Sequence, residues 1–227
     1  MAQELGRVTR PLASQYQGRR KLLLVPLLYG PSADAKDGVA ILQTYWDQMQ
    51  TQVASLESAL GGLSHIYHES LTQGGDDGLK QLEVRDQRSH GFVQSKCGEG
   101  ATLEATENAD LLAETLDLQR CLMIPLASEK VTLQLQEWFA NCNRERYEHI
   151  TRQIDETLGP DQTGLLMISE RHRVQFPQDI EVFYVSPPAL DEFHRWLQNW
   201  IAEQQKQATQ TPDPGVGQEQ ETQDSSG

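Results

Sequence analysis

Short runs of apolar residues alternate along the chain with longer segments in which apolar residues recur every three or four positions. Runs of the first kind are typical of strands buried on both faces, and the wider spacing is typical of helices with one buried face. The apolar runs predict five strands, at residues 21–29, 63–69, 121–126, 163–169 and 180–186.

The clearest helical spacing begins at Val39, from which apolar residues follow in steps of three and four up to Leu60. Asp34 or Asp37 can cap the start of this helix, because a carboxylate can accept a hydrogen bond from a free backbone N–H group. The Gly61–Gly62 pair can end it, because glycine readily adopts the left-handed conformation found after helices.

Residues 72–100 are rich in glycine, glutamine and charged residues, and they predict only a short helix followed by a loop. The same spacing rule predicts three longer helices elsewhere. These lie at residues 103–118, at residues 128–158 with Ser128 as N-cap, and after the Pro187–Pro188 pair.

The alternation of strands and helices predicts an α/β fold with a single open, mostly parallel sheet of about five strands and helices on both faces. Pro26 cannot donate a hydrogen bond, so the first strand is expected to lie at an edge or to contain a bulge. The length of 227 residues predicts one domain. We expect a flexible basic arm at residues 1–20, the α/β domain at 21–203 and a disordered tail at 204–227.

The chain is acidic, with a formal net charge of -14. This charge disfavours general binding to nucleic acids or anionic membranes, because such binding relies on Lys and Arg. The exception is the first 21 residues, where five cationic residues against Glu4 give a net charge of +4.

The sequence contains neither a secretory signal nor an apolar run long enough to cross a membrane, so we expect a cytoplasmic protein. The three cysteines are widely spaced, which predicts reduced thiols rather than a disulfide framework or a zinc knuckle. Cys121 and Cys142 are expected in the core. So are most of the aromatic residues at helical spacing, namely Trp46, Trp138, Phe139, Trp196 and Trp200, with the last two partly exposed.

Ligand sites of open α/β folds lie at the carboxyl ends of the strands, so the residues after each predicted strand are the first candidates. The densest group of reactive side chains is Ser169–Arg173, directly after the fourth strand. Glu170 is a candidate general base or metal ligand, His172 a proton shuttle or ligand, and Arg171 or Arg173 an anion clamp. The alternative is a charged surface turn.

His68 and Glu69 follow the second predicted strand and form a second candidate site, which would suit a divalent metal. Their spacing matches no established ligand motif, and the alternative is a strand end exposed to water. No phosphate-binding or dinucleotide-binding glycine motif is present, so the sequence identifies no cofactor.

The lack of a catalytic motif favours a noncatalytic interaction or regulatory protein that associates with itself or with a protein partner. The contact surface would be the 128–158 helix or the last helix, through residues such as Trp138 and Trp200. An alternative is a hydrolase that acts on an anionic small molecule at the carboxyl edge of the sheet. A third interpretation is a protein that contacts RNA or the translation machinery through its basic N-terminal arm.

Overall fold

The computed structural model describes residue 16, residues 18–30 and residues 35–210. Within this part of the chain, five parallel strands form one sheet in the order β3-β2-β4-β1-β5. The strands are β1 (Arg20–Pro26), β2 (Leu63–His68), β3 (Thr102–Leu103), β4 (Thr163–Ile168) and β5 (Ile180–Tyr184). The helices are α1 (Lys36–Leu60), α2 (Gly75–Arg85), α3 (Gln87–Gly98), α4 (Ala109–Met123), α5 (Glu129–Thr157) and α6 (Pro188–Gln210).

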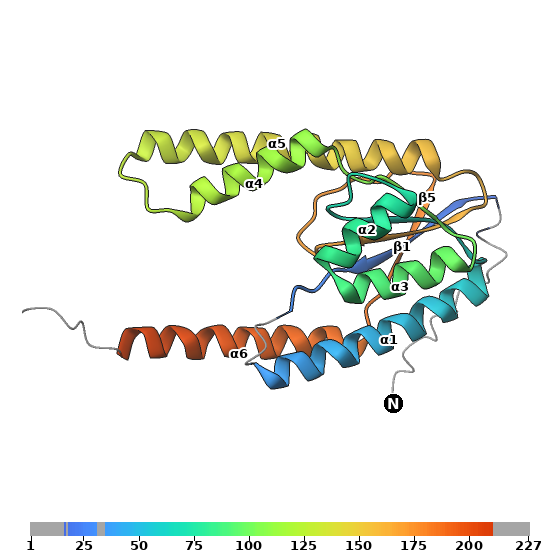
Figure 1. Ribbon diagram of the computed structural model, residues 1–227, viewed down its shortest axis with the longest axis horizontal. Helices are drawn as coiled ribbons and strands as arrows, with labels where there is room; N and C mark the ends of the chain where they lie inside the picture. The colour runs from blue at the N-terminus through green and yellow to red at the C-terminus, as the bar shows by residue number, and fades with distance from the viewer. Residues whose placement is uncertain (1–15, 17, 31–34, 211–227) are drawn as a thin grey trace, which may run out of the picture.

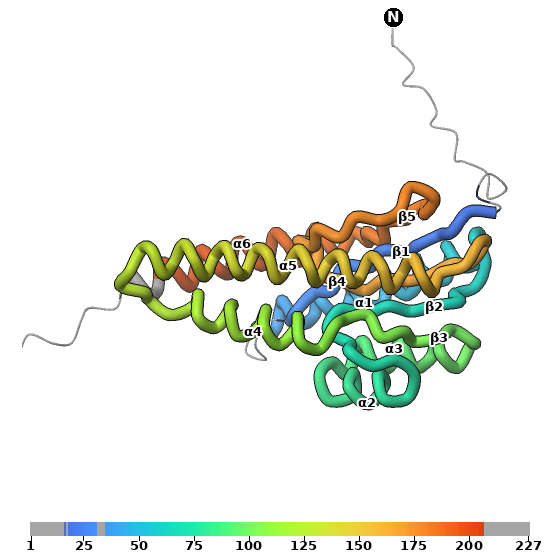
Figure 2. Tube along the Cα trace, turned by 90° about the horizontal axis from the view of Figure 1, so that it is seen from above, coloured from blue at the N-terminus to red at the C-terminus, as the bar shows by residue number. Residues whose placement is uncertain are grey.

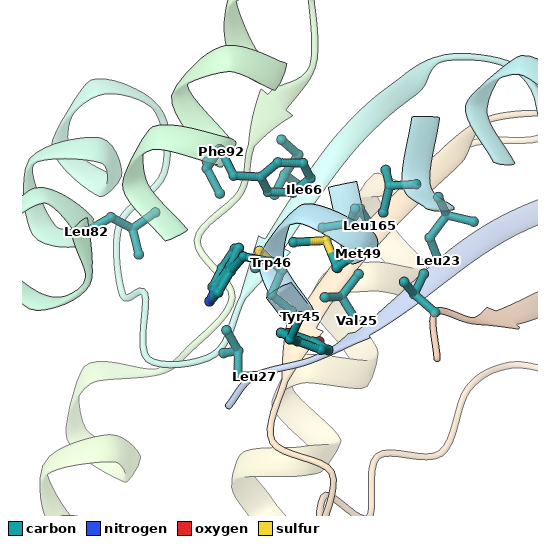
Figure 3. Close-up of a cluster of buried hydrophobic side chains, with 14 of the residues drawn as sticks. Leu23, Val25, Leu27, Tyr45, Trp46, Met49, Ile66, Leu82, Phe92 and Leu165 are labelled. Atoms are coloured by element: carbon teal, nitrogen blue, oxygen red, sulfur yellow. The ribbon is translucent and has the colours of Figure 1, made fainter. Parts of the chain in front are cut away.

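The predicted fold class is confirmed, because helices cover both faces of the parallel sheet (Figure 1). Side chains alternate between the faces along each strand. On β1, Leu22 and Leu24 point to the face covered by α5, where they meet Ile150 and Ile154. On the other face, shown in Figure 3, side chains of the strands pack against α1, α3 and α6; they include Leu23, Val25, Ile66 and Leu165 of the strands, with Tyr45, Trp46, Met49 and Phe92 of the helices.

The first strand is central rather than at an edge, since β1 pairs with both β4 and β5. Pro26 is accommodated because it is the last residue of the strand, where its missing N–H group interrupts nothing. Its carbonyl oxygen accepts a hydrogen bond of 2.5 Å from the Tyr45 hydroxyl. The prediction of an edge strand or a bulge at Pro26 is therefore wrong.

The predicted strand at 121–126 is also wrong, because this apolar run forms the end of α4 and the connection to α5. The composition of this run is typical of a buried strand, yet Met123 is 77% exposed and Cys121 is exposed as well. Instead, the two-residue strand β3 completes the sheet, too short to give an apolar pattern. Cys142 is buried, as the sequence predicts.

Most helix boundaries agree with the sequence patterns. Ser128 caps α5 by accepting a hydrogen bond from the backbone of Val131, and Gly61 ends α1 at a φ of 106°. Asp37 is not a cap but lies in the first turn of α1, where its charge complements the helix dipole, and the N-cap is Ala35. Asp34 lies outside the described residues.

Two differences concern residues 72–100 and the end of the chain. Residues 72–100 form two helices, α2 and α3, in place of one helix and a loop; Asp86 caps α3. α6 continues to Gln210, past residue 204, where the sequence predicts the tail to begin. Residues 1–15 of the predicted arm and residues 211–227 of the predicted tail lie outside the described residues.

The described part of the basic arm is engaged in ion pairs at the amino-terminal edge of the sheet. Arg19 pairs with Glu181, and Arg20 lies 2.7 Å from both Asp155 and Asp179. Lys21 pairs with Asp161 at 3.0 Å. Three of the five cationic residues on which the RNA interpretation depends therefore already have carboxylate partners, and only Arg7 and Arg10 lie outside the described residues.

Two helical elements extend beyond the sheet on the side where the strands end, as Figures 1 and 2 show from two directions. One is the hairpin of α4 and α5, and the other is α6. Only the second half of α5 covers the sheet, and the first half lies beside α4. As a consequence, Trp138 in that first half is 53% exposed, whereas Trp46 is buried as expected.

α6 is positioned by close contact with the start of α1. A Cβ atom added at Gly38 would lie 2.3 Å from Cη2 of Trp196, whose ring stacks on Trp200 with centroids 6.1 Å apart. We expect Gly38→Ala to lower the free energy of unfolding by about 1–3 kcal/mol, because the Trp196 ring must move. Urea unfolding monitored by tryptophan fluorescence measures this effect.

Gly91→Ala is the matched control, because Gly91 lies inside α3 and an added Cβ meets nothing within 4 Å. That change should stabilise the protein by about 0.5–1 kcal/mol through helix propensity. If Gly38→Ala and Gly91→Ala raised the free energy of unfolding equally, α1 would not pack closely against α6 at Gly38.

Candidate functional site at the carboxyl edge of the sheet

A cleft of about 1680 Å³ lies at the carboxyl ends of β1, β2 and β4, between α5 and α6. Its floor is formed by the residues that follow these strands, including Leu27, Glu69 and Ser169. Side chains of the α4–α5 hairpin and of α6 line its walls. These are the two helical elements that project beyond the sheet in Figure 1. This is the position at which open parallel sheets bind ligands.

A buried ion cluster lies beneath the cleft. Nε of Arg146, on α5, donates to both carboxylate oxygens of Glu107, at 2.9 and 2.8 Å, and its Nη2 also contacts Glu107. Nη2 lies 3.2 Å from a carboxylate oxygen of Glu69, which follows β2. The Glu107 side chain is 0% exposed and that of Arg146 is 8% exposed.

The other oxygen of Glu69 accepts a hydrogen bond of 2.5 Å from the backbone N–H of Ser169, which follows β4. Ser70 directly after Glu69 has a φ of 73°, in the left-handed region that non-glycine residues rarely adopt. Its N–H donates to Glu107, and its carbonyl accepts a hydrogen bond from Arg85. These contacts hold Glu69 in place, and a strained backbone of this kind often accompanies a functional site.

The Arg146 guanidinium remains charged at all accessible pH values. Burial by itself lowers its pKa, but the hydrogen bonds and charge of Glu107, together with Glu69, outweigh burial and raise the pKa above its ordinary value. Nη1 of Arg146 has no hydrogen-bond partner among the described residues, and Arg146 is one of the residues that line the cleft. A cationic donor fixed at the floor can therefore bind an anion.

Glu170 lines the cleft, and its partner is a histidine of α6. Its carboxylate is 2.6 Å from Nε2 of His194, and both side chains line the cleft. Because Nε2 donates to the carboxylate, Nδ1 of His194 is left as a proton acceptor. A carboxylate that orients an imidazole in this way is the arrangement used in general-base catalysis.

Arg171 and Arg173 also line the cleft, and Arg152 of α5 joins them there. None of the three forms an ion pair with a carboxylate that the structure describes, whereas Arg144 in the same cleft pairs with Glu148 at 3.9 Å. In a chain with a net charge of -14, this group of cations is a local exception. The cleft is therefore suited to an anionic ligand.

His172 is not among the residues that line the cleft. Its ring packs beside Phe176, with centroids 6.2 Å apart, and its Nδ1 accepts a hydrogen bond from the backbone of Val174. Burial lowers the pKa of this histidine. The structure thus brings Glu170, Arg171 and Arg173 to the cleft, while His172, their neighbour in sequence, stabilises the loop.

His68 and Glu69 do not converge as a pair of metal ligands. Consecutive residues of an extended strand point to opposite faces, and Glu69 reaches Arg146 on the α5 side. The His68 ring is buried, and its Nδ1 contacts the Glu69 carbonyl oxygen at 2.5 Å. Within the described residues, no group of three or more His, Cys, Asp or Glu side chains is arranged to hold a metal ion.

The buried His68 ring predicts how stability depends on pH. Burial lowers its pKa, so the folded state holds the neutral ring while the unfolded state binds a proton near pH 6.5. The contribution of His68 is therefore fully present above pH 6.5 and is lost as the pH falls from 6.5 through the folded-state pKa. His149 and His172 act in the same direction.

We expect the free energy of unfolding to fall between pH 7.5 and pH 5, and His68→Asn to reduce that fall. Asparagine can still donate to the Glu69 carbonyl but does not titrate. Urea unfolding of both proteins at the two pH values measures the difference. An equal pH dependence in both would show that His68 is not held neutral by the fold.

Three residues of the site are missed by reasoning from sequence: Arg146, Glu107 and His194. Arg146 had a signal, because residues 142, 146, 150 and 154 form one buried stripe of α5 and only the second is charged. A charge on the buried face of a helix indicates a partner. Glu107 lies in the loop between β3 and α4, but β3 is not predicted from the sequence, and His194 lies in a helix, so neither gives such a signal.

No helix among the described residues is both long and apolar enough to cross a membrane. Comparison of the chain with protein-family models, with curated proteins and with solved structures found no match. The geometry of the cleft is therefore what bears on function.

Proposed function

We propose that the protein is a hydrolase that acts on an anionic small molecule bound in the cleft between α5 and α6. The observation that carries this proposal is the Glu170–His194 pair, at 2.6 Å, in the same cleft as the cationic side chains of Arg146, Arg171 and Arg173. A base and an anion-binding group side by side are the two parts that such a reaction needs.

Each residue has a separate role in this proposal. Arg146, fixed by Glu107 and Glu69, holds the anionic group of the substrate through its Nη1 atom. Arg171 and Arg173, on the loop after β4, bind the same group from the rim. Charge-assisted hydrogen bonds to a guanidinium are strong and directional, which fixes the position of the substrate relative to His194.

The reaction is the attack of water on an ester carbonyl carbon. Nδ1 of His194 accepts the proton of the water molecule, and Glu170 stabilises the imidazolium that forms. The bond between the carbonyl carbon and the leaving oxygen then breaks, and the imidazolium returns its proton to that oxygen. The products are an acid and an alcohol, and His194 is neutral again.

Two matched esters test this function. 4-Acetoxy-3-nitrobenzoate carries a carboxylate, and 2-nitrophenyl acetate is the same ester without it; both release a coloured nitrophenolate. We expect a higher kcat/KM for the anionic ester, by roughly 10–100-fold for one charged hydrogen-bonded contact. Hydrolysis of neither ester above the rate in buffer, or equal kcat/KM values for both, would contradict the proposal.

A second candidate function is self-association through the tip of the α4–α5 hairpin. It is favoured by the apolar side chains exposed there, with Met123 77%, Ile124 59% and Leu133 59% exposed. Exposed apolar groups that lie close together often mark protein contacts. Sedimentation velocity over a range of concentrations should then show a dimer, and Met123→Asp with Ile124→Asp should give a monomer. A monomer at every concentration for the unaltered chain would exclude this candidate.

A further inference from the structure

We infer that the ligand of the cleft is an anionic amphiphile, with a charged head bound by the arginines at the floor and an apolar body held between α5 and α6. This inference rests on the proposed function and names the class of substrate. It comes from the distribution of charged and apolar residues along the cleft.

Apolar side chains of both helices also line the cleft. Phe139 lies on the first half of α5, before Arg144 and Arg146 in the chain, and Leu197 lies one turn beyond His194 on α6. Because residues four apart share a helix face, each of these two residues belongs to an apolar stripe along its helix. The cations, by contrast, lie where the strands end and on the second half of α5.

Each apolar stripe continues outward along its helix. On α5 the stripe of Phe139 extends through Leu135 to Val131, which is 47% exposed, and on α6 the stripe of Leu197 extends to Ile201, which is 42% exposed. Figure 1 shows these halves of α5 and α6 projecting in the same direction beyond the sheet. An elongated apolar body that enters between them would cover side chains that water now contacts.

The size of the cleft favours a ligand larger than a simple anion. The cleft holds about 1680 Å³, whereas sites for drug-sized ligands typically enclose about 300–1,000 Å³. An inorganic phosphate ion would contact the arginines and leave most of the apolar wall exposed. An alkyl or aryl body attached to the anion fills that space and adds hydrophobic binding energy with each methylene group.

The test is the dependence of affinity on chain length, measured by calorimetric titration of the whole chain with butanoate, hexanoate, octanoate and decanoate. We expect the dissociation constant to fall by about fourfold for each added methylene group, the value for a buried methylene. Octyltrimethylammonium, with an apolar body of similar length and a cationic head, should bind much more weakly than octanoate.

Two neighbouring aromatic residues of α5 provide matched variants. Phe139 lines the cleft, whereas Trp138 is 53% exposed and is not among the lining residues. Phe139→Gln should weaken decanoate binding by roughly tenfold or more and leave butanoate binding unchanged, because only the longer chain reaches the outer wall. Trp138→Gln should change neither. Melting temperatures of both variants confirm that the fold is kept.

The outcomes separate this inference from the proposed function. If the affinity does not depend on chain length but the protein still prefers the anionic ester, the ligand is not an amphiphile. That result would leave the hydrolase proposal unaffected. Equal weakening by Phe139→Gln and Trp138→Gln would also overturn the inference of an amphiphile. So would decanoate binding that is lost at high protein concentration, because a second copy would then fill the space between the helices.

Discussion

Arg146→Met is expected to lower the free energy of unfolding by about 3–5 kcal/mol, the range observed when one partner of a buried ion pair is removed. The reason is the Glu107 carboxylate, which is 0% exposed and takes two hydrogen bonds from Nε of Arg146. Methionine fills a similar volume but leaves this carboxylate buried without a counter-charge. Urea unfolding at pH 7.5 measures the change.

The matched control removes both charges. In the Arg146→Met, Glu107→Gln double variant, the amide oxygen of glutamine can still accept the hydrogen bond from the Ser70 backbone, and the fully buried carboxylate is removed. Glu69, whose side chain is 12% exposed, keeps the hydrogen bond from the Ser169 backbone. We expect the double variant to be more stable than Arg146→Met alone, although it has lost more charge. A single variant that loses less than about 1 kcal/mol, or a double variant less stable than the single one, would show that the cluster is not a compensated buried pair.

The second large effect concerns His194. If His194 is the general base, His194→Gln should lower kcat for 4-acetoxy-3-nitrobenzoate by about 10²–10⁴-fold, the usual contribution of such a group. KM should change little, because the arginines that hold the carboxylate remain. Glu170→Gln should give a smaller loss, since it removes the charge that stabilises the imidazolium but leaves the imidazole in place.

His172→Gln is the control for this prediction. His172 lies two residues from Glu170 in the chain, but it packs on Phe176 and is not among the cleft residues. Its variant should therefore keep kcat within about twofold after allowance for any loss of folded protein. Loss of activity in His172→Gln with full activity in His194→Gln would reverse the assignment of the base.

The fold was largely predictable because most of its strands and helices have long, regular patterns. The apolar spacing from Val39 to Leu60 and the runs at 163–169 and 180–186 each produced the expected element. The run at 121–126 gave a wrong prediction of a strand because its apolar residues are not in the core. They form the tip of the α4–α5 hairpin, where Met123 and Ile124 are exposed. A strand of two residues such as β3 has no periodicity from which it could be predicted.

The candidate site was predictable only where its residues follow strands that the sequence predicts. Glu69, Glu170, Arg171 and Arg173 are at strand ends, and all four line the cleft. The other residues of the candidate site come from elements that gave no such signal: Glu107 from the loop after the two-residue strand β3, Arg146 from the middle of α5 and His194 from α6. These residues come together because of how the helices pack against the sheet. That packing cannot be inferred from residues that are adjacent in the sequence. Glu170 thus has a histidine partner 24 positions away rather than at position 172.

In the proposed function, arginines of the cleft hold an anionic substrate for the Glu170–His194 pair. The most direct test compares kcat/KM of the unaltered protein with that of the Arg171→Gln, Arg173→Gln double variant for the anionic and the neutral ester. We predict a fall of roughly 10–100-fold for 4-acetoxy-3-nitrobenzoate and no change for 2-nitrophenyl acetate, because only the first presents a carboxylate to the guanidinium groups. An equal fall for both esters, or none for either, would show that these arginines do not bind the carboxylate of the substrate.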